Sequence, residues 1–171
     1  YAGSGNWKRE WKKGTVGRDS ANTLGGGHSH CGAMFYLGDQ WPDKYRGMMF
    51  MANTHGRRVN IDKLTRRGSS FVGTYEGDFM RANQSWFRGV SMMYGPDGAV
   101  YLSDWTDDGE CHDHDGVHRT SGRIYKITYN KGKTWQGDLA KASDHELLNY
   151  HHHKNAWFGR QARRLLHERA V

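Results

Sequence analysis

Short apolar runs separated by turn residues dominate the middle of the chain and predict β-strands. The clearest unit surrounds Pro96-Asp97-Gly98, where proline presets φ and glycine accepts a positive φ, so a tight turn is expected. Short strands joined by such turns are typical of a sandwich, a barrel or a propeller. The predicted strands lie at 33–37, 48–52, 58–63, 71–75, 89–94, 99–102 and 123–128.

The pattern becomes helical after residue 137. Ser143 and Glu146 have the spacing of a capping box, in which each satisfies a free amide of the other. Asn155 can cap a second helix, whose apolar positions recur every three or four residues at Phe158, Ala162, Leu165 and Leu166. We therefore expect a β region at 1–136, with 1–27 a long glycine-rich surface loop, followed by a helical region at 137–171.

Composition narrows the class of protein. The chain of 171 residues carries a net charge of +7, has 13% aromatic residues including seven Trp, and contains only two Pro. These aromatics indicate a folded, loop-rich chain, and no apolar run is long enough for a membrane-spanning helix. The chain has no initiator Met and ends within a helical pattern, so we expect an internal piece of a longer protein, with any targeting signal elsewhere.

Two histidine-rich segments are candidates for metal binding. His28 and His30 lie on the same side of an extended backbone, and Cys111, His112 and His114 offer thiolate and imidazole ligands. The same groups allow other interpretations, in which the histidines hydrogen-bond in their loop, and Cys31 and Cys111 either form a disulfide or are free thiols. The spacing matches no zinc-finger pattern, and neither cysteine lies in a motif for covalent haem attachment.

Basic and aromatic residues raise the question of nucleic-acid binding. Acidic residues are interleaved with them throughout, notably between Asp104 and Asp115, so we expect a mixed polar cleft and no nucleic-acid partner. Such a mixture suits an anionic cofactor or a sugar. The basic residues beside strands are His55, Arg57, Arg58, Arg66, Arg67, Arg88 and Arg123.

Several motifs together resemble one family. They are GHSHCGAMFYLGD at 27–39, NTHGRRVN at 53–60, WFRG at 86–89, YGPDG at 94–98 and RTSGRIY at 119–125. They resemble the sorbosone/aldose-sugar dehydrogenase-like β-propeller of the large membrane-bound dehydrogenase (PVC-type haem-binding) proteins. The resemblance covers about 25–170, and it implies a mainly β fold: the last two to three propeller blades, followed by the first HEAT-like helices.

That resemblance implies a function and a set of site residues. The chain would be a fragment of a periplasmic or other extracytoplasmic, membrane-associated oxidoreductase that oxidises a sugar or alcohol. Electrons would pass to a cytochrome c domain elsewhere, so haem c lies outside this segment. The implied cofactor is pyrroloquinoline quinone, with calcium or a transition metal as the other possibility. The family's base would lie outside this segment, and Arg88 falls where a cofactor arginine is expected. By their chemistry, His55 and His30 are the candidate bases here, because imidazole titrates near neutrality, and Arg57 and Asp104 join Arg88 as candidate cofactor-binding residues.

One residue departs from the family pattern, since His55 stands where a cofactor lysine is expected. Two alternatives therefore remain: a non-catalytic propeller and HEAT module that binds carbohydrate or protein, and a structural Cys/His metal site without a redox role. In each case the open sheet edges would pair with the rest of the polypeptide or with another chain.

Overall fold

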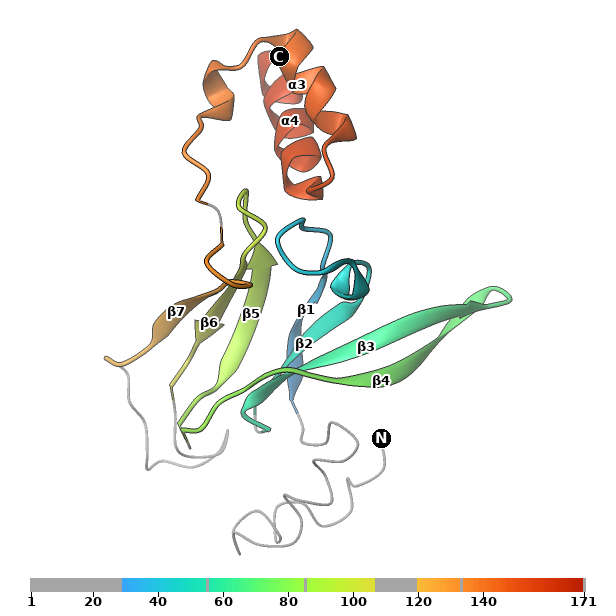
Figure 1. The fold of residues 1–171 in the computed structure, drawn as a ribbon, viewed down its shortest axis with the longest axis vertical. Helices are drawn as coiled ribbons and strands as arrows, with labels where there is room; N and C mark the ends of the chain where they lie inside the picture. Colours follow the sequence, from blue (N-terminus) through green and yellow to red (C-terminus); the bar gives the residue numbers. More distant parts are fainter. Residues whose placement is uncertain (1–28, 55, 85, 107–119, 133, 171) are drawn as a thin grey trace, which may run out of the picture. The chain divides into compact units, whose positions relative to one another are not determined.

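A computed structural model describes residues 29–54, 56–84, 86–106, 120–132 and 134–170. Its strands form two sheets, one of four strands in the order β1-β2-β3-β4 and one of three in the order β5-β6-β7 (Figure 1). The expected mainly β fold is therefore confirmed, and the described residues form no closed propeller. The strands are β1 (His30–Phe35), β2 (Met49–Asn53), β3 (Arg58–Arg67), β4 (Ser70–Arg81), β5 (Gly89–Tyr94), β6 (Val100–Asp104) and β7 (Arg123–Ile127).

Neighbouring strands of the first sheet are antiparallel, and the order in the sheet follows the order in the chain. The apolar run at 48–52 is a strand as predicted, and β2 is buried along most of its length. Phe50 and Val59 are fully buried, and the Phe50 ring packs 4.6 Å from that of Phe79. Apolar burial of this kind stabilises by about 25 cal/mol per Å², so β2 anchors the sheet.

The strands β3 and β4 are longer than the sequence pattern predicts. Their outer halves form a two-stranded arm that turns at Gly68, where φ is +62° (Figure 1). Most side chains of the outer half are exposed, including Phe71 and Val72, which are 61% and 45% exposed. The pattern at 71–75 predicts the outer part of β4, whereas the outer part of β3 at 64–67 covers no core and lacks the apolar alternation on which strand prediction depends.

The predicted turn between β5 and β6 is confirmed. The Gly98 N–H donates to the Gly95 carbonyl at 3.0 Å, and the Gly95 N–H donates to the Ala99 carbonyl at 3.0 Å. Gly98 has a φ of +71°, the left-handed conformation that glycine adopts without strain.

Helices follow the last strand. The short 3-10 turns are η1 (Asp43–Tyr45), η2 (Leu139–Lys141) and η3 (Tyr150–His152), and the α-helices are α3 (Asp144–Asn149) and α4 (Ala156–Arg169). The predicted capping box is present, with Ser143 and Glu146 bonded to each other's backbone, and Asn155 caps α4 by accepting from the Trp157 N–H at 3.0 Å. These helices share a small core of Leu139, Leu147, Phe158 and Ala162.

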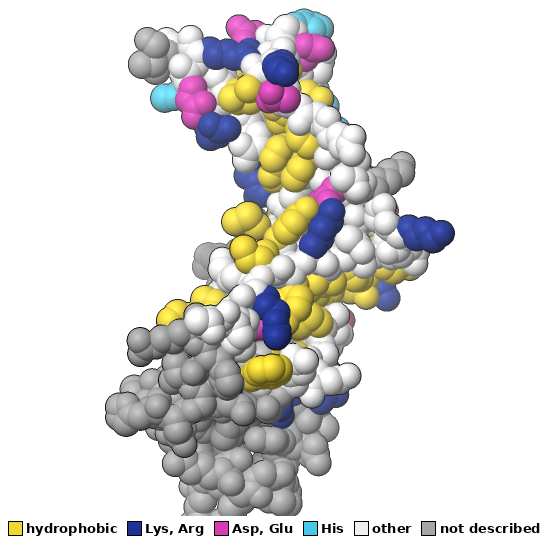
Figure 2. Space-filling model, turned by 90° about the vertical axis from the view of Figure 1, so that its left-hand side faces the viewer, with side chains coloured by type: hydrophobic (Ala, Val, Ile, Leu, Met, Phe, Trp, Pro, Cys, Tyr) yellow, Lys and Arg dark blue, Asp and Glu magenta, His cyan; other side chains and the backbone are white. Residues whose placement is uncertain are grey.

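Charged side chains of both signs cover the outside of this helical segment (Figure 2). Several are paired: Arg164 with Glu168 at 2.7 Å and Arg169 with Asp144 at 2.6 Å. His151 faces the end of α3, with its Nδ1 3.1 Å from the Leu147 carbonyl. The basic residues are therefore largely engaged in local contacts. No helix in the described ranges has the length and apolar character that crossing a membrane requires.

The chain divides into two compact units. The first unit comprises Tyr1–Phe35, Met48–Met92 and Leu102–Tyr125, and the second comprises Tyr36–Gly47, Met93–Tyr101 and Lys126–Val171. Strands β5, β6 and β7 contribute residues to both units.

Candidate functional site

Polar residues gather where the strands of the first unit begin or end. Antiparallel register places His30 opposite Asn53, Asn53 opposite Arg58, and Arg58 opposite Arg81, in one row across the first sheet. In the second sheet, the Trp105 N–H donates to the Arg88 carbonyl at 2.8 Å, so the end of β6 lies beside the start of β5. We call this region the polar end; its residues include His30, Asn53, Arg58, Asn60, Asp78, Arg88, Asp104 and Arg123.

A hydrogen-bonded network centred on Asp78 fills one side of the polar end. The Asp78 carboxylate accepts from Arg58 Nη1 at 3.0 Å, from Asn60 Nδ2 at 2.9 Å and from the Tyr75 hydroxyl at 2.8 Å. Arg58 is only 5% exposed. A buried charge is tolerated when it is paired and hydrogen-bonded, so Arg58 and Asp78 depend on each other.

The network extends from Asn60 to the first strand. Asn60 Oδ1 accepts from Asn53 Nδ2 at 2.9 Å and lies 3.1 Å from His30 Nε2. His30 therefore hydrogen-bonds to a residue of β3 within the polar end. Burial raises the pKa of the nearby Asp62 carboxyl, and the charge of His30 partly opposes that rise.

The two sheets approach each other closely within the first unit. Cys31 Sγ lies 3.3 Å from Thr54 Oγ1, and both donate to the Gly89 carbonyl, Thr54 at 2.9 Å and Cys31 at 3.6 Å. A Cβ on Gly89 would lie 3.3 Å from both Ala52 and Leu102, so a side chain at this position would crowd the contact. These bonds bring β1, which starts with His30, to the strand that follows Arg88.

Arg88 and Asp104 form a second polar cluster. Asp104 Oδ1 accepts from the backbone N–H of Arg88 and from that of Thr106, each at 2.9 Å. The Arg88 guanidinium donates from Nη1 to the Phe87 carbonyl at 2.9 Å. Because Arg88 is 3% exposed and Asp104 is 4% exposed, both groups fasten the chain around β5 and β6.

A cleft of about 350 Å³ opens beside this cluster, a size in the range of small-ligand sites. Arg123 organises one side of it: Nη1 donates to the Tyr125 hydroxyl at 3.1 Å and lies 3.5 Å from Gln84 Oε1, while the guanidinium covers the Trp86 ring at 5.2 Å. The Tyr125 hydroxyl in turn lies 3.4 Å from Asp104 Oδ2. The lining residues are Met80, Ala82, Asn83, Gln84, Phe87 and Tyr125.

The cleft combines aromatic faces with amide, hydroxyl and guanidinium groups. Asn83 and Gln84 are exposed, so their amides can bond a ligand as donors and as acceptors. Neither residue belongs to a pattern that predicts a site, because their role depends on the contact of the loop after β4 with Arg123 and Tyr125. The only sequence signal is their place just before the WFRG motif at 86–89.

Four of the predicted site residues lie in the described structure. His30, Arg88 and Asp104 belong to the polar end, and Arg57 adjoins it with a φ of +53° and partial exposure. His28, His55, Cys111, His112 and His114 lie outside the described residues, so the predicted metal site and the role of His55 stay predictions.

Cys31 is a free thiol in the part of the chain that the structure describes, and its pairing with Cys111 likewise stays a prediction. Within the described ranges, no three His, Cys, Asp or Glu side chains are grouped closely enough to hold a metal ion.

Comparison with protein families gives one match. Residues 7–131 match the model of DUF7133, a domain of unknown function. Searches of curated proteins and of solved structures returned no match. The matched segment spans more than half of the chain and includes the whole polar end. The chain therefore belongs to the DUF7133 family.

Proposed function

We propose that this chain is part of an extracytoplasmic, membrane-associated oxidoreductase that oxidises a sugar or an alcohol. The first sheet supports a propeller origin, because a blade is a four-stranded antiparallel sheet whose strands follow chain order. In this proposal the two sheets belong to the last blades, the helices after β7 begin a HEAT-like array, and the rest of the polypeptide or another chain completes the propeller. Electrons would pass to a cytochrome c domain outside this segment.

The observation that carries the proposal is the cleft at the polar end. A sugar or alcohol presents hydroxyl groups that both donate and accept, together with an apolar C–H surface. The amides of Asn83 and Gln84 match the hydroxyl groups, and the rings of Phe87 and Tyr125 match the C–H surface.

Arg123 and Tyr125 give the cleft a fixed hydrogen-bond direction. Arg123 donates to the Tyr125 hydroxyl, whose own proton is directed toward Asp104 Oδ2. The remaining lone pair of that oxygen can accept from a substrate hydroxyl, so Tyr125 would orient the substrate. Oxidation of the alcohol carbon would remove two electrons, which would pass to the cytochrome c domain, and two protons, for which His55 is a candidate base by the chemistry of imidazole.

The resemblance implies that residues of the polar end bind the quinone, but these residues do not fit that role. That role requires the Arg88 guanidinium to reach a carboxylate of pyrroloquinoline quinone, but the side chain is 3% exposed and donates to the Phe87 carbonyl. Asp104 is likewise engaged by two backbone amides. We therefore derive no step through a quinone and assign Arg88 a structural role.

Arg88, Asp104 and His30 are all held by hydrogen bonds within the protein. This favours a second candidate function, a non-catalytic module that binds carbohydrate or protein. The two candidates share the ligand-binding cleft and differ in whether electrons leave the ligand. Calcium or a transition metal, or a structural Cys/His site at 111–114, remains a separate proposal for residues outside the described structure.

The test is substrate-dependent reduction of an artificial electron acceptor by the full-length protein that contains this chain. Sugars and primary alcohols would be screened with and without added pyrroloquinoline quinone. We expect turnover with at least one substrate, and a rise in KM of about threefold to tenfold in Gln84→Ala, the loss of one or two hydrogen bonds. Gln136→Ala, an exposed glutamine of the second unit, is the matched control and should leave KM unchanged.

Two results would contradict the proposal. Absence of reduction with every substrate, combined with measurable binding, would replace the oxidoreductase by the binding module. Equal KM values for Gln84→Ala and Gln136→Ala would show that the cleft does not bind the substrate.

A further inference from the structure

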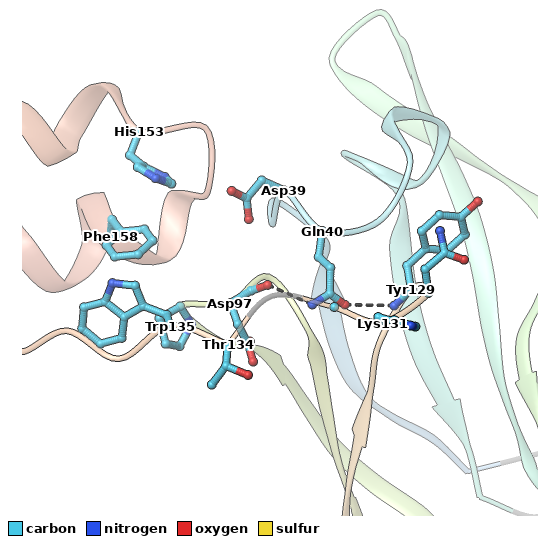
Figure 3. A pocket seen from close by; sticks show the side chains of 12 residues that line it. Asp39, Gln40, Asp97, Tyr129, Lys131, Thr134, Trp135, His153 and Phe158 are labelled. Carbon is cyan, nitrogen blue, oxygen red and sulfur yellow. Dashed lines mark hydrogen bonds between the residues drawn. The ribbon is translucent and has the colours of Figure 1, made fainter.

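The second unit contains a larger pocket, separate from the cleft at the polar end. Its volume is about 600 Å³, within the range of small-molecule sites. Three segments form it: the loop after β1, the turn between β5 and β6, and the chain after β7, including the start of α4 (Figure 3). The residues that line the pocket include Asp39, Gln40, Lys131, Trp135, His153 and Phe158.

Aromatic rings form one wall of this pocket. Trp135 meets Phe158 edge to face with ring centroids 5.6 Å apart, and the His153 ring lies 4.3 Å from that of Phe158. His153 Nδ1 accepts from the Asn155 N–H at 3.0 Å, so the neutral ring carries its proton on Nε2 as a hydrogen-bond donor. Phe158 belongs to the helical core, so packing in that core fixes the position of this aromatic wall of the pocket.

Polar groups face that wall, with Asp39 opposite Phe158 and His153 (Figure 3). Asp39 is exposed, and in the described part of the chain its carboxylate has no hydrogen bond or ion pair. Gln40 is fixed, because Nε2 donates to the Asp97 carbonyl at 3.1 Å and Oε1 accepts from the Tyr129 N–H at 2.9 Å.

Gly98 keeps this side of the pocket open. A Cβ there would lie 2.6 Å from Asp39 Oδ1 and 2.7 Å from the Gln40 backbone nitrogen, so a side chain would displace the loop that carries Asp39. The conformation of Gly98 and the position of the pocket carboxylate are therefore linked.

Charge decides which ligand suits the pocket. Asp97 also lines it, but its carboxylate is paired with Lys126 and accepts from the Tyr101 hydroxyl. Of the remaining lining residues, Asp39 is acidic and Lys131 is basic, so the pocket has no strong net charge. A small cation is disfavoured by the +7 charge of the chain, and an anion would face Asp39.

We propose that this pocket binds a neutral carbohydrate of one or two rings, with the C–H face of the sugar on Trp135 and a hydroxyl group donating to Asp39. Aromatic faces bury apolar C–H surface, while the carboxylate, His153 Nε2 and Lys131 supply acceptor and donor groups for hydroxyls. The proposal is independent of the oxidoreductase, since it uses only residues of the second unit and involves no chemical change of the sugar.

The test is nuclear magnetic resonance of the 171-residue chain titrated with glucose, xylose, maltose and cellobiose. The indole N–H signal of Trp135 is assigned as the signal absent from Trp135→Phe, and that of Trp105 serves as an exposed reference in the first unit. We expect at least one sugar to shift the Trp135 signal saturably while the Trp105 signal stays in place. Asp39→Ala should weaken this binding at least about tenfold, the loss of a hydrogen bond to a charged group.

Asp43→Ala is the matched control, because Asp43 is exposed, pairs with Lys154 and does not line the pocket. It should bind the sugar like the parent chain. The proposal is overturned if no sugar shifts Trp135 at concentrations up to about 100 mM, or if Asp39→Ala and the parent chain bind equally. Because Asp39 is exposed, its replacement should preserve the fold, which unchanged signals from the helical core of the second unit around Leu147 would verify.

Discussion

Replacing Asp78 by alanine should strongly destabilise the first unit. The change removes the carboxylate that accepts from Arg58, Asn60 and Tyr75, and it leaves the Arg58 guanidinium with the Gly56 carbonyl at 3.1 Å. Breaking a buried ion pair by removing one partner costs about 3–5 kcal/mol. Because folded domains are stable by only about 5–15 kcal/mol, this would be a large fraction of the total.

The assay is native-state hydrogen exchange of the β3 and β4 amides, since it reports on the first unit alone. Asp78→Ala should reduce the free energy of opening by about 3–5 kcal/mol. Glu168→Ala, which breaks the exposed pair with Arg164, is the control: it should leave the β3 and β4 amides unchanged and cost about 0.3–0.5 kcal/mol at the α4 amides.

A double variant tests the cause. If the penalty arises from an unpaired buried charge, Arg58→Met combined with Asp78→Ala should be more stable than Asp78→Ala alone by at least about 1 kcal/mol. A loss below about 1 kcal/mol in Asp78→Ala, or a double variant less stable than the single one, would refute this description of the polar end.

Two further predictions concern stability. Asn155→Ala should lower the stability of the second unit by about 2–4 kcal/mol in thermal unfolding, because it removes the α4 cap and the Nδ2 donor to the Gly95 and Pro96 carbonyls. A loss no larger than that of the exposed control Gln136→Ala would contradict this prediction. Burial raises the pKa of Asp62 in the folded chain, so its contribution to stability is complete below the unfolded pKa and is lost as the pH rises through the folded pKa. Asp62→Asn should therefore raise the urea midpoint at pH 7 and change it little at pH 3, and equal effects at both pH values would be inconsistent with this assignment.

Local signals allowed much of the fold to be predicted from the sequence. The capping box at Ser143 and Glu146 and the turn at Pro96-Asp97-Gly98 each depend on residues within a few positions of one another. The extension of β3 to 64–67 could not be predicted, because this exposed part of the strand has no buried face to produce an apolar alternation.

The candidate site was harder to predict for a physical reason. A resemblance gives the position of Arg88 in the chain, but tertiary packing decides that its guanidinium is buried, where it donates to the Phe87 carbonyl. Gln84 gains its place in the cleft from Arg123, which is 39 residues away, and no local pattern encodes that contact. Side chains joined by tertiary packing are visible only once the strands are placed.

The most direct test of the proposed substrate site is a crystal structure of the protein soaked with the best substrate from the reduction screen. We expect electron density for the sugar or alcohol in the cleft at the polar end, within hydrogen-bond distance of Gln84 or Tyr125. Density that is absent from this cleft at saturating ligand, or confined to the pocket beside Trp135, would contradict the proposed substrate site.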